Sequence, residues 1–172
     1  MIVPSRSFRT FGLVALCLTL SAAPSFAQST GRSRTGIGFS AGVAQFDMAG
    51  TGTAPFGALR LERELASWLV GDLALGLIRP DEQIALRQTY LIPEAQLQAQ
   101  RTFGRVRPYL GAGIGMLRSL NGSARTYAIF SGSTGTRVAV TNALDVRGEL
   151  RVTGQSATLA QWQWTFGLAR RF

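Results

Sequence analysis

The chain contains no histidine and no lysine, and its only cysteine is Cys17. Without histidine, it lacks the most common general base and a frequent metal ligand. Without a second cysteine, it can form no internal disulfide and no thiolate metal cluster. Paired carboxylates such as Glu94 and Glu149 could act as acid and base, but with arginines nearby they are better explained as salt-bridge partners. We therefore expect no enzymatic activity, no metal and no cofactor.

Long hydrophobic runs are also missing. The run Phe11–Leu20 has about ten apolar residues, which is too short for a membrane-spanning helix, and no later stretch is longer. Arginines precede this run, and Ser25-Phe26-Ala27 supplies small residues where a signal peptidase cleaves. We predict a cleaved signal peptide over residues 1–27 and one exported domain over residues 28–172. Lipid attachment at Cys17 is an alternative, although Leu16 is larger than the residue such a site needs.

Acidic residues are scarce. The chain has 18 basic residues, all arginine, against 9 acidic ones, and its net charge is +9. Loss of Arg6 and Arg9 with the signal peptide would leave +7. A basic chain can bind nucleic acid, but export argues against that partner. We expect anionic lipid head groups to supply the counter-charge.

What the chain has is alternation, which is clearest over residues 160–172. One face of a strand there carries Trp162, Trp164, Phe166, Leu168 and Phe172, and the other carries mainly polar or small residues. A helix would mix the two sets. A strand with lipid on its apolar side and a barrel lumen on its polar side explains both.

This ending resembles the eight-stranded outer-membrane β-barrels of Gram-negative bacteria (OmpA-like, OmpX-like and OmpW-like proteins), and the match lies at Gly167, Leu168, Arg171 and Phe172. Arg170 departs from the family, which usually has Tyr or another apolar residue there. The resemblance implies an all-β fold, an eight-stranded antiparallel up-and-down transmembrane β-barrel. It also implies a monomer whose partners are outer-membrane lipid, lipopolysaccharide and the barrel-assembly machinery. The expected assembly signal is Trp164, Phe166, Leu168 and Phe172.

Seven further strands are predicted from the same two-residue period. They are residues 35–45, 56–62, 69–78, 90–101, 108–117, 136–141 and 145–152. Pro93 lacks an N–H, so we predict a bulge there. The stretch Pro108–Gly115 resembles the glycine-alternating strand of the family. A phosphate-binding glycine loop is the alternative, but it needs a following helix, and the sequence shows none.

Residues 58–78 are the ambiguous segment. They are rich in Leu, Ala, Glu and Arg, and an amphipathic helix is an open alternative there. The alternation on both sides, together with Gly71 and Gly76, favours strands.

The connections are expected to differ in length at the two ends of the barrel. Those after the first, third, fifth and seventh strands are predicted to be longer, including residues 118–135, and short turns are typical of the periplasmic side. Both ends of the exported domain would then face the periplasm. Arginines in or beside the outer loops are candidate contacts for lipopolysaccharide phosphates, with solvated loop charge as the alternative: Arg79, Arg87, Arg118, Arg125 and Arg137.

The polar faces of the strands carry a nearly neutral set of charges, namely Arg60, Glu62, Asp72, Glu94, Arg147, Glu149 and Arg151. Side chains fill the interior of an eight-stranded barrel, and buried charges must pair. We interpret this set as a structural plug, with a narrow conduit for ions or small solutes as the alternative.

The sequence thus predicts an integral outer-membrane protein with a structural, membrane-integrity or surface-interaction role. One alternative is a small pore or carrier for small or apolar solutes. A second is a soluble periplasmic lipocalin-like barrel, with apolar residues inside. Known outer-membrane barrel enzymes, such as the lipid A deacylase, the palmitoyltransferase and the omptin proteases, each rely on a histidine that this chain lacks.

Overall fold

The computed structural model describes residues 35–45, 52–79, 89–121, 126–155 and 159–172. The predicted signal peptide and its cleavage site lie outside these residues. So do Arg87 and Arg125, two of the candidate lipopolysaccharide contacts.

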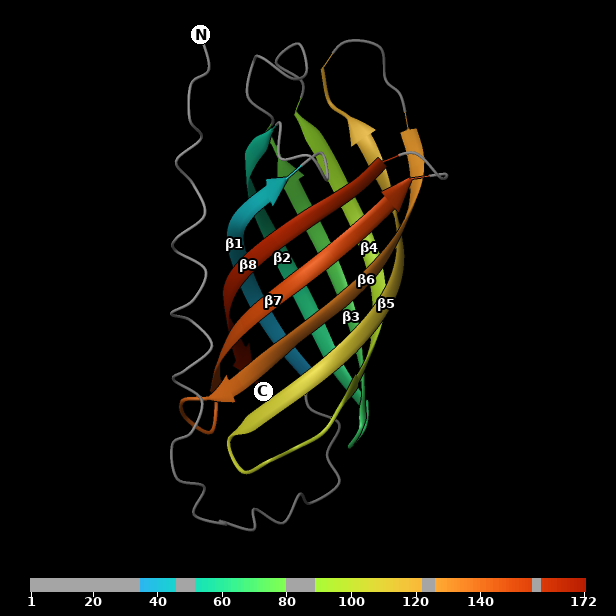
Figure 1. Cartoon of the computed structure of the whole chain (residues 1–172). Coiled ribbons are helices and arrows are strands. Elements are labelled where there is room, and N and C mark those ends of the chain that lie inside the picture. Colours follow the sequence, from blue (N-terminus) through green and yellow to red (C-terminus); the bar gives the residue numbers. More distant parts are fainter. Residues whose placement is uncertain (1–34, 46–51, 80–88, 122–125, 156–158) are drawn as a thin grey trace, which may run out of the picture.

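Eight antiparallel strands form a closed barrel in which each strand pairs with its neighbours in the sequence and β8 pairs with β1 (Figure 1). The strands are β1 (Thr35–Gln45), β2 (Thr53–Ala66), β3 (Leu69–Ile78), β4 (Tyr90–Gln100), β5 (Val106–Ser119), β6 (Thr126–Ala139), β7 (Leu144–Gln155) and β8 (Leu159–Arg171). Closure leaves no unpaired sheet edge. The predicted eight-stranded antiparallel barrel is therefore confirmed.

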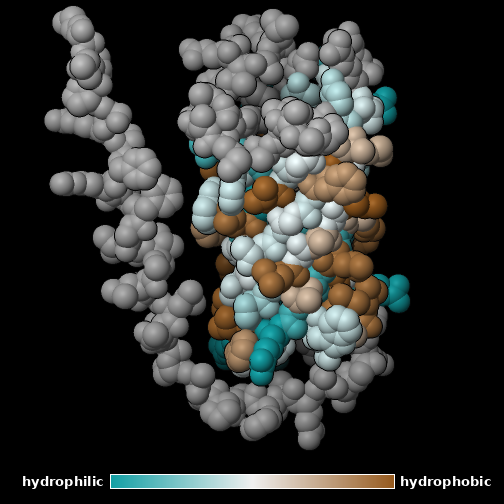
Figure 2. Space-filling model, turned by 45° about the vertical axis from the view of Figure 1, so that its right-hand side comes forward, coloured by the Kyte–Doolittle hydropathy of each residue, from teal (hydrophilic) through white to brown (hydrophobic). Residues whose placement is uncertain are grey.

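The wall of the barrel is apolar outside and polar inside. Alternate residues of each strand point to opposite faces. Hydrophobic side chains cover much of the outer wall (Figure 2), and the largest exposed ones include Phe39, Leu59, Leu73, Leu97, Leu110, Ile114, Phe130, Trp164, Phe166 and Leu168. A lipocalin-like barrel needs the opposite arrangement, so that alternative is wrong.

Residues 58–78 form β2, a turn at Ser67–Trp68 and β3, so the helical alternative is also wrong. Strand propensity is decided by packing on a half-buried surface, and the outward Leu and inward polar residues fit a sheet here. In the described part of the chain, no helix is long and apolar enough to cross a membrane.

The predicted loop 118–135 is wrong, because most of it belongs to β5 and β6. The serines and glycines that suggested a loop lie on a strand. Ser131 and Ser133 are buried in the lumen, while Phe130 points outward from the same strand. Small polar residues are suitable for an inner wall that faces other side chains, which is why this strand has a composition typical of loops.

The two ends of the barrel differ. Turns 67–68, 101–105 and 140–143 lie at one end together with Thr35 and Phe172, and we call it the turn end; the opposite end is the loop end (Figure 1). At the loop end, the connections after β1 and β3 are longer than the turns, as predicted. The connection after β7 was also predicted to be longer, and that prediction is wrong, because β7 extends to Gln155 and β8 begins at Leu159.

Two irregularities interrupt the ladders. The β2–β3 register shifts between Glu64 and Ala66, which makes Leu65 the additional residue of a bulge. At Pro93 the β4–β5 register is the same on both sides, so the predicted bulge is absent. Instead, Ile92 and Pro93 have no ladder partner on β5. Proline has no N–H to donate, which accounts for this gap.

Candidate functional site: the charged lumen

The interior of the barrel holds equal numbers of acidic and basic side chains. All six acids among the described residues face the lumen: Glu62, Glu64, Asp72, Glu94, Asp145 and Glu149. Six arginines pair with them: Arg60, Arg107, Arg137, Arg147, Arg151 and Arg171. All seven predicted lumen residues belong to this network. A buried charge is tolerated when it is paired and hydrogen-bonded, and here the formal charges cancel.

Glu149 on β7 is the centre of the network. Its Oε1 accepts hydrogen bonds from Arg60 at 3.1 Å and from Arg151 at 2.8 Å, and its Oε2 pairs with Arg147. The Tyr109 hydroxyl donates to the same Oε2 at 2.8 Å. One carboxylate therefore connects side chains from β2, β5 and β7 across the lumen.

Asp72 on β3 is the second acid in the middle of the lumen. It pairs with Arg60, and Arg147 reaches its Oδ2 at 3.1 Å. The Gln98 side-chain amide donates to Oδ2 at 2.8 Å. Both oxygens of this fully buried carboxylate are therefore satisfied, as burial requires.

Tyr109 lies between two arginines. The guanidinium carbon of Arg137 is 4.5 Å from the centre of the Tyr109 ring, and that of Arg147 is 4.8 Å from it. Cations over an aromatic face are attracted by its quadrupole, more strongly where water is excluded. The ring of Tyr109 on β5 therefore contacts Arg137 from β6 and Arg147 from β7.

Arg137 is buried in the lumen, with only 2 % of its surface exposed. It pairs with Glu62 at 3.3 Å and donates to Gln100 at 3.2 Å. Its prediction as a lipopolysaccharide contact is therefore wrong. The sequence placed it beside a loop, but β6 begins at Thr126 and carries Arg137 to the turn end on an inward position.

A smaller cluster closes the turn end of the lumen. Arg107 donates to both oxygens of Asp145 at 3.1 Å and lies 3.4 Å from Glu64. Arg171 pairs with Asp145 from the other side. These residues lie within three positions of the strand ends at the turn end, so the ion pairs cross the lumen near this opening of the barrel.

Toward the loop end, Glu94 marks the limit of the charged region. Its carboxylate pairs with Arg151 and accepts a hydrogen bond from Ser131. Beyond it, an apolar cluster occupies the lumen and consists of Ala44, Ala54, Phe56, Ala58, Ile78, Ile92 and Ile129, with Tyr90 and Leu117 packed against it. The lumen thus holds ion pairs in one part, and in the other the apolar cluster with uncharged polar side chains such as Gln161 and Gln163 on β8.

Glycine makes space for this packing on β6. A Cβ at Gly135 would collide with the Tyr109 hydroxyl and with the carbonyl oxygen of Gly148. Gly135→Ala should therefore destabilise the barrel by about 1–3 kcal/mol through overpacking. Gly132 on the same strand has nothing within 4 Å of its would-be Cβ, so Gly132→Ala is the matched control and should have little effect. Urea unfolding of the two variants in the same vesicles measures the difference, and equal midpoints would contradict the tight contact.

The other predicted residues lie elsewhere. Arg79 and Arg118 are exposed at the loop end. The proposed assembly residues Trp164, Phe166, Leu168 and Phe172 all point outward, between 48 % and 73 % exposed. The first three lie on the outer wall of β8, and Phe172 directly follows this strand. None of the four belongs to the lumen network.

The predicted charge network left out several of its members, although alternation places most of them on inward faces: Glu64, Gln96, Gln98, Gln100, Arg107, Tyr109, Asp145 and Arg171. The signal was present in the alternation of residues 94–100, where every second residue is Glu or Gln. Their amides bridge the charges. Gln96 accepts from Ser133 at 3.0 Å and from Gln98 at 2.6 Å.

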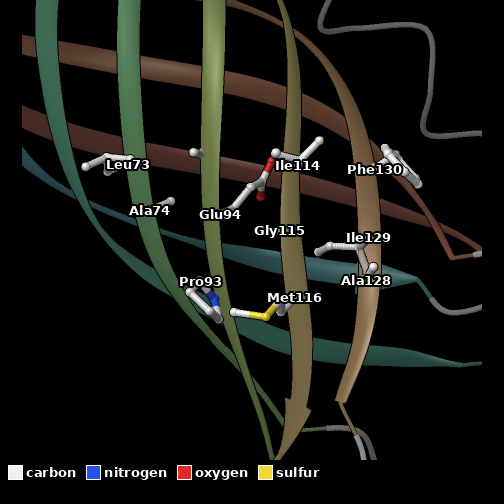
Figure 3. Close-up of a pocket in the computed structure, with 11 residues that line it drawn as sticks. Leu73, Ala74, Pro93, Glu94, Ile114, Gly115, Met116, Ala128, Ile129 and Phe130 are labelled. Carbon is white, nitrogen blue, oxygen red and sulfur yellow. The ribbon is translucent and has the colours of Figure 1, made fainter.

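An apolar groove of about 590 Å³ opens over β3 to β6 at the gap in the β4–β5 ladder. Leu73 lies at one edge and Phe130 at the other, with Pro93 and Met116 between them (Figure 3). The Glu94 carboxylate is engaged with Arg151 in the lumen, so the groove offers no free polar group. Across the described ranges, no group of three or more His, Cys, Asp or Glu residues could hold a metal ion.

Comparison with known proteins agrees with this architecture. The model of a family described as "Outer membrane protein beta-barrel domain" matches residues 13–172. Among curated proteins, none matches the sequence.

Three solved structures illustrate the structural likeness. Neisserial surface protein A (NspA) has a TM-score of 0.65 at 16% identity, over 81% of this chain and 97% of that one. The N-terminal β-barrel domain of Pseudomonas aeruginosa OprF has a TM-score of 0.63 at 12% identity, over 82% and 100%. The outer membrane enzyme PagL has a TM-score of 0.55 at 14% identity, over 77% and 98%. At these identities the likeness concerns the fold alone.

Proposed function

Because the chain belongs to the outer membrane protein beta-barrel domain family, we propose that it is a structural barrel of the bacterial outer membrane with a closed, non-conducting lumen. In this proposal the apolar outer wall contacts acyl chains. The turn end faces the periplasm, as short turns do in this class. The role is mechanical: the barrel supports the membrane and presents its loop end at the cell surface.

The observation that carries the proposal is the filling of the lumen. Ion pairs from Arg107–Asp145 to Arg151–Glu94 extend along it, and the apolar cluster around Phe56 continues toward the loop end. An ion crossing this interior would have to displace paired charges and then pass the apolar cluster, where the neighbouring polar side chains, such as Gln163 beside Ala44, are uncharged; both steps are costly. PagL shows that this fold can carry an enzyme, but a chain without histidine lacks the usual general base.

Single-channel recording tests the proposal. We expect no steady openings after the full chain is inserted into a planar bilayer, with insertion checked by different gel migration before and after boiling in SDS. The double variant Arg147→Ser/Glu149→Ser removes two paired side chains without changing the net charge, and it should show openings that the unsubstituted chain lacks. Steady openings of the unsubstituted chain would contradict the closed lumen.

The second candidate function, a small pore or carrier, is favoured by one observation. Among the buried side-chain atoms of the described residues, Ser40 Oγ, Gln161 Nε2 and Gln163 Oε1 have no hydrogen-bond partner. All three lie on β1 or β8. Buried polar atoms normally bind protein or water, so this side of the lumen could hold water. Openings in the recording above would support this function.

The expected partners follow from the same placement. We propose that the assembly machinery binds the outward residues Trp164, Phe166, Leu168 and Phe172, as the family resemblance implies. Arg79 and Arg118 at the loop end remain available for lipopolysaccharide phosphates. We propose a monomer, since barrel closure leaves no strand edge for pairing with a second copy.

A further inference from the structure

Among the described residues, the outer surface of the turn end carries arginines and no acidic side chain. Arg63 on β2, Arg101 and Arg105 in the β4–β5 turn, and Arg170 on β8 are all exposed. The six acids of the described strands and turns face the lumen, where interior arginines pair with them. In the described part of the chain, these four guanidiniums therefore have no carboxylate partner.

These arginines are spread around the barrel. In the backbone ladder, Arg63 lies opposite Thr35 at the start of β1. Arg170 lies opposite Ile37 on β1 and opposite Leu144 at the start of β7. The backbone carbonyl of Arg105 accepts a hydrogen bond from Ala139 at the end of β6, at 2.8 Å. The positive charge therefore lies in two groups at the turn end, Arg63 and Arg170 on either side of β1, and Arg101 and Arg105 in the β4–β5 turn.

Exposed aromatic side chains share this rim. Trp68, Phe103 and Phe172 are each more than half exposed. The guanidinium carbon of Arg101 is 5.2 Å from the centre of the Phe103 ring, and that of Arg170 is 5.8 Å from the Phe172 ring. Stacking on an aromatic face orients a planar guanidinium and leaves its N–H edge available to an anion. Tryptophan is enriched where the acyl region of a membrane meets its head groups.

We propose that this rim, defined as Arg63, Arg101, Arg105 and Arg170 with Trp68, Phe103 and Phe172, binds the phosphates of anionic phospholipids in the adjacent leaflet. The inference rests on the proposed membrane function and its orientation. Guanidinium binds phosphate through two parallel hydrogen bonds. The apolar wall directly above the rim receives the acyl chains of the same lipid. A zwitterionic head group binds less well, because its ammonium is repelled by the uncompensated arginines.

Electron spin resonance tests the proposal on the full chain folded into phosphatidylcholine bilayers. Trace amounts of spin-labelled phosphatidylglycerol or spin-labelled phosphatidylcholine report the fraction of each lipid immobilised at the barrel surface. We expect phosphatidylglycerol to associate at least about threefold more strongly, and the preference to decline in high salt, since a basic residue near a membrane surface attracts anionic lipid electrostatically.

Variants locate the site. Arg101→Gln/Arg105→Gln changes only turn residues and should lower the preference, and adding Arg63→Gln and Arg170→Gln should abolish it. Arg79→Gln/Arg118→Gln at the loop end is the control for the opposite leaflet. These two arginines can also bind lipid phosphate, so we expect the preference to fall less than in the rim variants and not to be abolished. If both lipids associate equally with an inserted chain, the lipid-binding rim is overturned while the proposed membrane function stands. The same holds if the preference is lost in Arg79→Gln/Arg118→Gln but kept in the rim variants. A chain that immobilises neither lipid and shows no gel shift would instead contradict the proposed membrane function.

Discussion

Glu149→Gln is expected to lower the free energy of unfolding by about 3–5 kcal/mol, the usual effect of removing one partner from a buried ion pair. The substitution keeps the volume of the side chain, removes its charge and replaces one acceptor oxygen by an NH2 group, which cannot accept from the arginines or from Tyr109. Arg60, Arg147 and Arg151 would then share one acid fewer, in an interior from which water is largely excluded. Urea unfolding in phosphatidylcholine vesicles, followed by tryptophan fluorescence, measures the change.

Glu64→Gln is the matched control for this prediction. Glu64 also faces the lumen, but its side chain is 27 % exposed and its contact with Arg107 is 3.4 Å long. Partly solvated pairs contribute little, so we expect a loss of about 1 kcal/mol or less. The double variant Glu149→Gln/Arg60→Gln restores neutrality and should lose less than the sum of its single changes. Equal effects at Glu149 and Glu64 would contradict the central position of Glu149.

Alternation was sufficient to predict the barrel and the direction of most side chains. Strand β3 was predicted with its observed ends, and β8 to within a residue or two, because apolar and polar residues alternate there without interruption. The two-residue period also fixes which residues face inward, so the seven predicted lumen charges could be identified before their partners were known. A period carries no information on depth, however. It could not show that Glu149 meets Arg60, which lies 89 residues away in the sequence.

The errors have a common cause. Ser131, Ser133 and the glycines around them are typical of loops, but on the inner wall the two serines are small enough to contact Glu94 and Gln96 of β4, which lies two strands away. Reading them as a loop displaced the start of β6 and placed Arg137 at the wrong end. The apolar cluster around Phe56 was missed for a related reason. It combines inward residues from β1 to β4 and from β6, and each strand contributes too few to form a pattern of its own.

Leu59→Arg should distinguish a barrel in lipid from one in water. Leu59 lies in the middle of β2, points outward and is 61 % exposed, between Phe39 and Leu75 on the neighbouring strands. In water, an arginine at such an exposed position would change stability little. At the middle of a bilayer it should cost about 2–4 kcal/mol, because the charge must enter the acyl region.

Leu65→Arg on the same strand provides the control, because depth is the main difference between the two positions. Leu65 is 55 % exposed and lies next to the turn at Ser67–Trp68, near the level of the arginine rim. An arginine there reaches the head groups and should cost about 0–1 kcal/mol. Urea unfolding of both variants in the same vesicles gives the comparison. Equal costs at both positions would mean that the apolar wall is not embedded at the depth proposed here. A larger cost at Leu59 would be difficult to explain for any protein surrounded by water, since both side chains are similarly exposed and neither contacts the charged lumen.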